Sequence, residues 1–548
     1  MTSTLGRRWE ALREHERARA RRTSHQPNVP GRGIVASYSH RFWAMIVAVG
    51  VIAGLGAAAL YELLQLVQHT AWSYDAGAFL TAVQDASSAR RIAVLAVAGV
   101  IAGVGVVLLR RRWGAGGGDV SEAVWLHGGQ LAPVPSALRG VLSIVTVGMG
   151  SSLGREGAPQ QVGAAAASRL AEWTGLPSWQ RRLLAACGAG AGMAAIYNVP
   201  FGGAVFALEV LLGTLALPLV LPALATTSIA VAVAWVAVPN HPTYTVPTYG
   251  VSASQLVWAL LAGPLAGLVA VVWVRAVGRA NRLRPRTDRS RLLAPIAVLT
   301  SLGVVSLAYP ALLGNGLDIV QRSMLGEISL GLLAALLVLK PLATIACLAS
   351  GAPGGLFTPT IALGVLFGGV AGHLWAGMWP GAPVGSYALL GGAAMLAAAM
   401  QGPLSAVVLM LELTRHADSL MVPMLVAVTG ATIVARLMRA PSVYSVRIAH
   451  DTLPVQSAWA GAPWAAEGAL AGRHDDDGAA AAAGARPTAG ENALSAGPPA
   501  SAPAASARPT AGDNAVSADP TTGEPAASAR PATSAPAAPA TPKPRVEA

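Results

Sequence analysis

Six long runs of apolar residues constrain this chain more than any other feature of its sequence. They lie at residues 42–67, 92–109, 256–274, 292–307, 328–348 and 421–437. A helix that crosses a bilayer needs roughly 20 consecutive, mostly apolar residues. With 53% apolar and 12% charged residues over a length of 548, the chain is predicted to be an all-α polytopic membrane protein. The first run is long enough to span, so no cleavable signal peptide is expected.

The formal net charge of +12 is carried almost entirely by arginine, since Lys340 and Lys543 are the only lysines. The arginines gather at residues 7–41, 110–112 and 275–291, near the ends of apolar runs. The positive-inside rule places these three regions, and with them both termini, on the cytoplasmic side of the cell (inner) membrane. This distribution gives no support to nucleic-acid binding. Lys340 is expected to extend its ammonium group toward the cytoplasmic face.

Residues 154–161, GREGAPQQ, place an arginine and a glutamate inside an otherwise apolar region. Ionised side chains at membrane depth are costly and usually line a water path or bind an ion. The glycines free the backbone to bend, and Ala158-Pro159 predicts the first turn of a helix that continues to Trp173. The start of such a helix presents unpaired N–H groups and a positive dipole end, which favour an anion.

The chain also contains an internal duplication. Residues 198–210, NVPFGGAVFALEV, align without a gap on residues 401–413, QGPLSAVVLMLEL, which places Pro200 on Pro403 and Glu209 on Glu412. The GREGAP break has a counterpart in residues 351–359, GAPGGLFTP. The first half begins at the basic arm and ends in a charge-free loop at residues 239–250, so the halves are expected to be inverted repeats with a substrate site between broken helices.

These observations predict five parts in the chain. Residues 1–40 form a basic cytoplasmic arm, 41–237 the first membrane half, 238–253 an external linker, and 254–450 the second, inverted half. Residues 451–548 are rich in Ala and Pro and repeat the element RPTAG. With almost no large apolar residues, this tail cannot bury a core and is predicted to be disordered.

Four motifs in this order resemble the CLC family of chloride channels and chloride/proton antiporters, in a form without CBS domains. They are GREGAPQQ, NxPxxGxxFxxE at residues 198–209, GGLFTP at 354–359 and PSVYS at 441–445. The resemblance implies an inverted repeat of tilted and broken helices, a homodimer in the lipid bilayer, and one pathway per subunit for chloride or a similar small anion. Protons are a possible second substrate.

The resemblance also implies roles for particular residues. Glu156 would be the gating glutamate, whose carboxylate competes with chloride. Arg155 and Gly157 beside it, and the backbone at Leu356 and Phe357, would border the anion, and the Tyr444 hydroxyl would close its inner side. Plainer alternatives remain open: Glu156 as a helix-capping acid, Arg155 as a structural partner, and Tyr444 as an interfacial anchor.

Two positions depart from the family pattern. Gly118 stands where the family usually has the serine of its GSGIP motif, and Asp119 follows it, so a hydroxyl is lost and an acid is added. Proton-coupled members carry a glutamate just after the position of Glu209, whereas this chain has Val210, which cannot carry a proton. Val210 therefore favours a channel, with an antiporter as the alternative if Glu209 or a shifted water path delivers protons.

Other functional classes have less support. An intramembrane enzyme would need a nucleophile with its base or a metal motif such as HExxH, and the sequence contains neither. Cys187 and Cys347 have no neighbours of the metal-binding kind, so no metal and no cofactor is expected. A carrier of organic solutes would need a larger pocket than the closely spaced glycine breaks suggest.

Overall fold

The computed structural model describes residues 38–448, except residue 76 and residues 115–117. The predicted tail at 451–548, and the predicted basic arm at 1–40 apart from its last three residues, lie outside the described residues. Within the described ranges the chain forms helices and no strand. The prediction of an all-α fold is confirmed.

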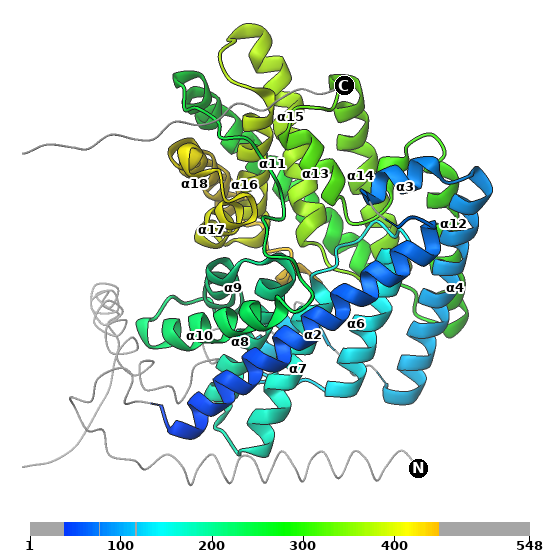
Figure 1. Cartoon of the computed structure of the whole chain (residues 1–548), viewed down its shortest axis with the longest axis vertical. Coiled ribbons are helices and arrows are strands. Elements are labelled where there is room, and N and C mark those ends of the chain that lie inside the picture. The colour runs from blue at the N-terminus through cyan, green and yellow to red at the C-terminus, as the bar shows by residue number, and fades with distance from the viewer. Residues whose placement is uncertain (1–37, 76, 115–117, 449–548) are drawn as a thin grey trace, which may run out of the picture. The chain divides into compact units, whose positions relative to one another are not determined.

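The helices of the first half occupy residues 40–234 (Figure 1). They are α2 (His40–Trp72), α3 (Phe79–Asp85), α4 (Ser88–Trp113), α5 (Val120–Leu126), α6 (Pro133–Gly148), α7 (Gly157–Trp173), α8 (Ser178–Tyr197), α9 (Pro200–Phe206), the π-helix η2 (Ala207–Leu212) and α10 (Leu217–Ala234). The predicted helix after the GREGAP break is α7, which ends at Trp173 as expected.

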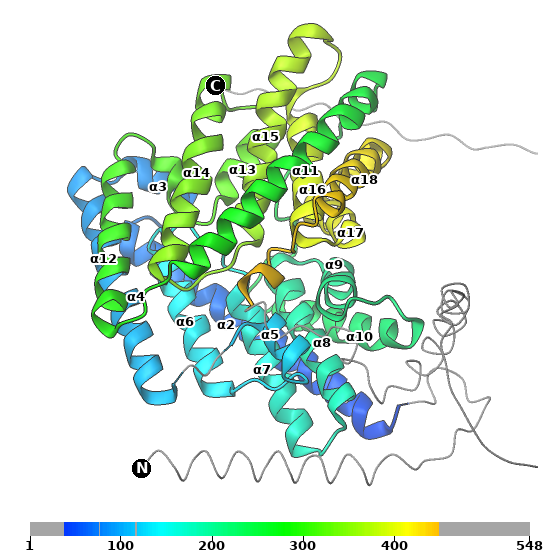
Figure 2. The same ribbon diagram turned by 180° about the vertical axis from the view of Figure 1, so that it is seen from behind.

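The helices of the second half follow the same plan and are clearest from behind (Figure 2). They are α11 (Ala253–Arg282), α12 (Asp288–Val305), the 3₁₀ turn η3 (Pro310–Leu312), α13 (Leu317–Met324), α14 (Leu330–Ser350), α15 (Phe357–Met378), α16 (Val384–Met400), α17 (Pro403–Thr414), η4 (Asp418–Leu420), α18 (Met421–Leu437) and η5 (Ser445–Arg447).

Seven helical segments are long and apolar enough to cross a membrane, and they include five of the six predicted runs. They are α2, α4, α10, α11, α14, α15 and the segment Asp418–Leu437. The run at 292–307 is helical but falls outside this set. Its helix, α12, starts with Asp288, Arg289 and Arg291, and this charged first turn shortens the stretch that hydrocarbon would tolerate.

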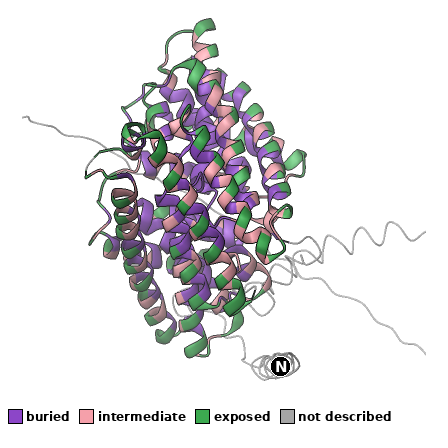
Figure 3. Cartoon of the chain, turned by 90° about the vertical axis from the view of Figure 1, so that its right-hand side faces the viewer, coloured by how far each residue is buried: buried purple, intermediate pink, exposed green. Residues whose placement is uncertain are grey.

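Exposed residues lie along the outer faces of the helices, and buried residues lie inside (Figure 3). Many of the exposed residues are large and apolar, whereas many of the buried ones are small. On α11, Leu260, Leu265 and Val272 are each more than half exposed, while Ala259, Ala266 and Ala270 are buried. A water-soluble protein rarely leaves such a stripe uncovered. The pattern suits a helix with one face against lipid and the other against protein.

The two halves share matched helix ends. Asn198 ends α8 and Gln401 ends α16, both in the left-handed backbone conformation with φ of 58° and 59°. Proline then begins the next helix in each half, at Pro200 and at Pro403. These equivalent positions are the ones that the sequence alignment of the repeats paired.

The aligned glutamates cap helices of the opposite half. The Glu412 carboxylate accepts hydrogen bonds from the backbone N–H groups of Phe201 (3.1 Å) and Gly202 (2.5 Å), at the start of α9. The Glu209 carboxylate accepts from Leu404 (3.1 Å) and Ser405 (2.6 Å), at the start of α17. Carboxylates at helix N-termini satisfy otherwise unpaired donors, so this exchange joins the halves.

Replacing Glu412 or Glu209 with alanine should lower stability by about 1 kcal/mol each, the usual effect of removing a helix cap. The two effects should be similar because the contacts are equivalent. Thermal unfolding in detergent, followed by circular dichroism, measures the change against Glu327→Ala, whose side chain is half exposed. Equal melting temperatures for all three variants would contradict the capping role.

One expectation about Lys340 is wrong. Its side chain does not extend to a membrane face but is 1% exposed, and its Nζ donates to the carbonyls of Leu312 (2.9 Å) and Gly314 (2.8 Å). The η3 turn packs against α14 at this point, so backbone oxygens are available inside the protein. These backbone oxygens compensate the buried ammonium charge. In an apolar helix without such partners, the lysine side chain would have to extend to the membrane surface.

Candidate functional site

The two glycine breaks meet in the middle of the fold. Gly154 and Gly355 exchange both of their backbone hydrogen bonds at 2.8 Å in an isolated antiparallel bridge. Gly154 precedes α7 and Gly355 precedes α15, so the bridge brings the N-termini of these two helices together. Both ends present backbone N–H groups to one small region, as the sequence predicts for an anion site.

The Glu156 carboxylate lies at the start of α15. Its Oε1 accepts a hydrogen bond of 2.6 Å from the backbone N–H of Phe357, the first residue of α15. Its Oε2 accepts from the hydroxyls of Tyr197 (3.3 Å) and Thr358 (3.4 Å). The side chain is 2% exposed. We call this set of donors, the Phe357 N–H and the two hydroxyls, the Phe357 seat. A free anion placed there would have the same donors as the carboxylate.

The Arg155 side chain is not one of the donors of the Phe357 seat. Its guanidinium carbon lies 5.1 Å from the centre of the Tyr197 ring, in a cation–π contact. Because the Tyr197 hydroxyl is bonded to Glu156, Arg155 supports the ring that holds the carboxylate. This placement suits the structural alternative considered for Arg155.

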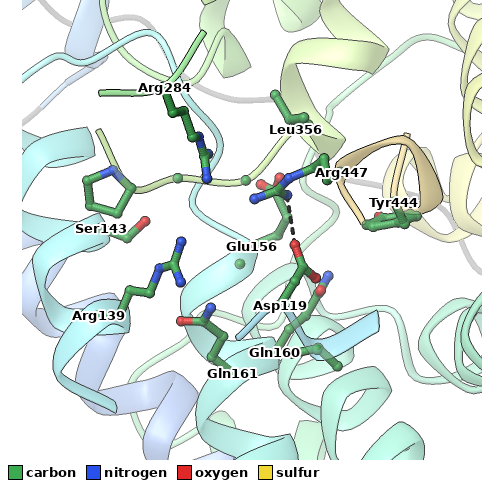
Figure 4. A pocket seen from close by; sticks show the side chains of 15 residues that line it. Asp119, Arg139, Ser143, Glu156, Gln160, Gln161, Arg284, Leu356, Tyr444 and Arg447 are labelled. Carbon is green, nitrogen blue, oxygen red and sulfur yellow. Dashed lines mark ion pairs between the residues drawn. The ribbon is translucent and has the colours of Figure 1, made fainter. Parts of the chain in front are cut away.

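A small cavity of about 50 Å³ lies beside Glu156 (Figure 4). Its volume suits a few waters or one small anion. We call it the arginine cavity, because three arginines share its wall with two acids. It is lined by Asp119, Val120, Arg139, Ser143, Glu156, Gly157, Gln160, Gln161, Arg284, Pro353, Gly354, Gly355, Leu356, Tyr444 and Arg447.

Tyr444, Leu356 and Gly157, three of the predicted anion-binding residues, line this cavity. Tyr444 immediately precedes η5, and its ring packs edge-on against Phe206 at 5.7 Å between centroids. Among the described residues its hydroxyl has one long contact, 3.9 Å to the sulfur of Met400. The tyrosine is therefore held by its ring.

Asp119 faces the cavity and is neutralised there. Its Oδ1 accepts from the Ser121 N–H (3.2 Å), which caps α5, and its Oδ2 pairs with Arg447 at 3.0 Å. Burial raises the pKa of Asp119, but Arg447, the Ser121 N–H and two further arginines lower it more, so the net pKa is below its ordinary value. Asp119 is thus an ionised group that already has a cation.

Gly118 lies beside a different acid. A Cβ added there would come within 3.2 Å of a Glu122 carboxylate oxygen, and Gly118 is not among the described residues that line the cavity. A hydroxyl at this position would meet Glu122 first. The site therefore receives no side-chain donor from this segment.

The two residues at the predicted coupling position do not face the cavity either. Val210 is buried, and both Glu209 oxygens are occupied at the start of α17, where Oε2 also accepts from the Ser405 hydroxyl at 2.6 Å. The described residues contain no cluster of three or more side chains suited to a metal ion.

Sequence reasoning missed Tyr197, Thr358, Arg139, Ser143 and Arg284 as members of this site. Arg284 had been attributed to the positive-inside pattern. Arg139 offered a signal, because it is the lone charge in the apolar stretch of α6. Thr358 lies within the GGLFTP motif, but the motif gave its side chain no role. Tyr197 and Ser143 carry no signal in the sequence, since only folding brings their helices to the same place.

Comparisons with known proteins agree with this architecture. The family model described as voltage gated chloride channel matches residues 98–436. The voltage-gated ClC-type chloride channel ClcB of Salmonella typhimurium strain LT2 is 31% identical over 406 residues, covering 72% of this chain and 96% of that protein. ClcB of Escherichia coli O9:H4 is also 31% identical, with coverage of 74% and 98%.

Two solved structures have a similar fold. A slow cyanobacterial Cl⁻/H⁺ antiporter has a TM-score of 0.64 at 21% identity, covering 75% of this chain and 97% of that one. A CLC-type fluoride/proton antiporter has a TM-score of 0.60 at 20% identity, with coverage of 74% and 97%. The family model, the relatives and the fold lead to one conclusion: this chain is a multi-pass membrane protein that belongs to the CLC family.

Proposed function

We propose that this protein transports chloride across the membrane and that Glu156 gates its pathway. The observation that carries the proposal is the Phe357 seat, where the Glu156 carboxylate takes a helix N-terminal donor at 2.6 Å. A chloride ion needs the same donor, so the tethered carboxylate and the ion compete for it. Protonation or displacement of Glu156 would free the seat.

Within this proposal, channel-like conduction is favoured over coupled transport. A coupled exchanger needs a group that carries protons between Glu156 and the other side. Val210 cannot carry one, Glu209 is engaged as a helix cap, and Asp119 has a lowered pKa because of its arginine neighbours. None of the three is therefore available to carry protons.

The alternative is a chloride/proton antiporter. The two solved structures described above are of antiporters, and Asp119 lines the same cavity as Glu156. If Arg447 released Asp119 during transport, the pKa of that carboxyl would rise and it could take up a proton.

The assembly and its orientation belong to the same proposal. We expect a homodimer in the cell's inner membrane with both termini cytoplasmic. The second and third arginine clusters meet at one end of the fold, where Arg111 pairs with Asp288 at 3.0 Å. A location of both arginine clusters on the same face of the membrane agrees with the positive-inside rule.

Proteoliposomes loaded with chloride distinguish the two mechanisms. External chloride and pH are recorded together after a potassium ionophore releases the charge. We expect chloride efflux without proton movement. Proton movement driven uphill by chloride would instead establish the antiporter, and the absence of any chloride flux would overturn the proposed substrate.

A further inference from the structure

A second cavity, of about 310 Å³, lies between α3, α13 and α14 (Figure 1). We call it the η3 cavity, because Pro310 and Ala311 of that turn form part of its wall. Its inner wall is apolar and includes the buried side chains of Leu80, Ile319 and Leu336. Pockets that bind ligands have volumes from about 300 Å³ upward and mostly apolar walls with a few polar groups, so this cavity is large enough to hold one.

The η3 cavity lies at the end of the fold away from the second and third arginine clusters. The packed helices α4 and α12 show this. At one end Arg111 of α4 pairs with Asp288, the first residue of α12. At the other end Arg91 of α4 donates to the carbonyl of Ser306, just after α12, at 3.2 Å. Tyr309, which lines the cavity, follows soon afterwards. In the orientation proposed above, the cavity therefore lies at the outer membrane surface, where tyrosine is a common residue.

The cavity borders the surface that faces lipid. Leu332 belongs to the membrane-spanning helix α14, lines the cavity and is 40% exposed. Other large apolar side chains that flank the lining residues along the chain are also exposed, namely Leu307, Leu325 and Leu330. Such an apolar surface marks a membrane contact. A lipid acyl chain can therefore reach the η3 cavity directly from the bilayer.

The charged residues of the lining lie at its exposed rim. Arg322 Nε is 3.5 Å from Glu327 Oε2, and their side chains are 46% and 50% exposed. An exposed ion pair of this kind contributes little to stability. A bound group that carries both signs of charge could therefore replace each partner of the pair at little cost.

We propose that the η3 cavity binds an acyl chain of a membrane phospholipid with a zwitterionic headgroup, of the phosphatidylethanolamine class. The phosphate accepts hydrogen bonds from the Arg322 guanidinium, whose flat fork matches two phosphate oxygens. The ammonium group, joined to the phosphate by a short link, pairs with the Glu327 carboxylate. An anionic headgroup such as phosphatidylglycerol would satisfy Arg322 but would leave Glu327 without a cation.

The acyl chain fills space that suits water poorly. A water inside a protein needs about two to four polar partners, and the inner wall of the η3 cavity is apolar. A lipid chain makes van der Waals contacts with this wall that an empty cavity lacks. Because lipid chains are equally apolar in the bilayer and in the cavity, the choice among phospholipids depends on the headgroup.

This lipid site goes beyond the proposed transport function, because it needs a bilayer but no anion pathway. Lipid binding should also stabilise the fold. Leu312 of the η3 turn accepts a hydrogen bond from the buried Lys340, so a lipid that fills the cavity holds the turn on which this lysine depends. A ligand that binds only the folded state raises the melting temperature.

The test uses the full chain, purified in detergent and stripped of lipid. Phosphatidylethanolamine or phosphatidylglycerol with the same acyl chains is added at equal concentrations. Native mass spectrometry measures binding, and circular dichroism measures the melting temperature. Phosphatidylethanolamine should bind more tightly and raise the melting temperature more. Ala311→Phe should abolish both effects, because its ring would fill the cavity. Ala334→Phe is the matched control, because Ala334 is an exposed residue of α14 outside the lining.

Two rim variants test the headgroup without filling the cavity. Arg322→Gln should weaken phosphatidylethanolamine binding roughly 10-fold or more, the equivalent of one charge-assisted hydrogen bond. Glu327→Gln should remove the preference for phosphatidylethanolamine over phosphatidylglycerol. Without added lipid, both variants should melt at the wild-type temperature, because the exposed ion pair contributes little.

Three outcomes would overturn the lipid site. They are equal responses of the wild type to the two phospholipids, an unchanged response to phosphatidylethanolamine in Ala311→Phe, and equal stabilisation by a free fatty acid of the same chain length. None of these readouts requires chloride flux, so a failure of the proposed transport function would leave the result of this test unaffected.

Discussion

Replacing Glu156 with alanine should raise chloride flux roughly 10- to 100-fold, the equivalent of losing a charge-assisted hydrogen bond of about 1.5–3 kcal/mol. The wild-type carboxylate competes with chloride for the Phe357 N–H at 2.6 Å, and alanine leaves the donor to the ion. Flux through the variant should also become independent of pH. Wild-type flux should rise as pH falls, because a protonated carboxyl competes less well than its ion.

Glu156→Gln separates charge from size in the same measurement. The amide keeps an acceptor for the Phe357 N–H but carries no charge and no titratable proton, so any proton-linked transport should disappear while anions still bind. Glu172→Gln, at the exposed end of the same helix, should behave as wild type. Wild-type flux and wild-type pH dependence in Glu156→Ala would remove Glu156 from the gating role.

The fold could be predicted largely from the sequence, because each step depended on a local signal. Apolar runs gave the long helices, Ala158-Pro159 gave the start of α7 within one residue, and the gapless alignment paired Glu209 with Glu412. The reciprocal caps that these glutamates form follow from the same symmetry. Hydrophobic periodicity and internal duplication are properties of the linear sequence, so both can be recognised without a structure.

The site could be predicted only in part. Glu156 could be singled out because glycine breaks and a helix start surround it in the sequence, whereas Leu356 and Phe357 were implied only by the resemblance to the CLC family. The partners of Asp119 and Lys340 were not, since Arg447 and the η3 carbonyls come from segments distant in sequence. Whether a charge is paired depends on the tertiary fold, and an isolated acid or lysine in an apolar stretch gives no sign of its partner.

Replacing Gly355 with alanine should free the Phe357 seat without removing the Glu156 carboxylate. A Cβ at Gly355 would overlap Oε1 and the carboxyl carbon of Glu156, and the glycine backbone is not in the left-handed region. The mobile group is the glutamate side chain, so it should leave. We expect chloride flux close to that of Glu156→Ala, with Gly331→Ala, which meets nothing within 4 Å, as the control.

A double variant decides whether the steric effect acts through the carboxylate. If Gly355→Ala raises chloride flux only by expelling the Glu156 side chain, the double variant should have the same flux as Glu156→Ala alone. The two effects on flux should then be fully non-additive. Additive increases would mean that Gly355 shapes the path independently. A loss of flux in Gly355→Ala alone, at normal thermal stability, would mean that the added methyl group blocks the seat. Additive increases or a loss of flux would place the narrowest point of the pathway at the Gly154–Gly355 bridge. Fully non-additive increases, the result that we expect, place it at the Glu156 carboxylate.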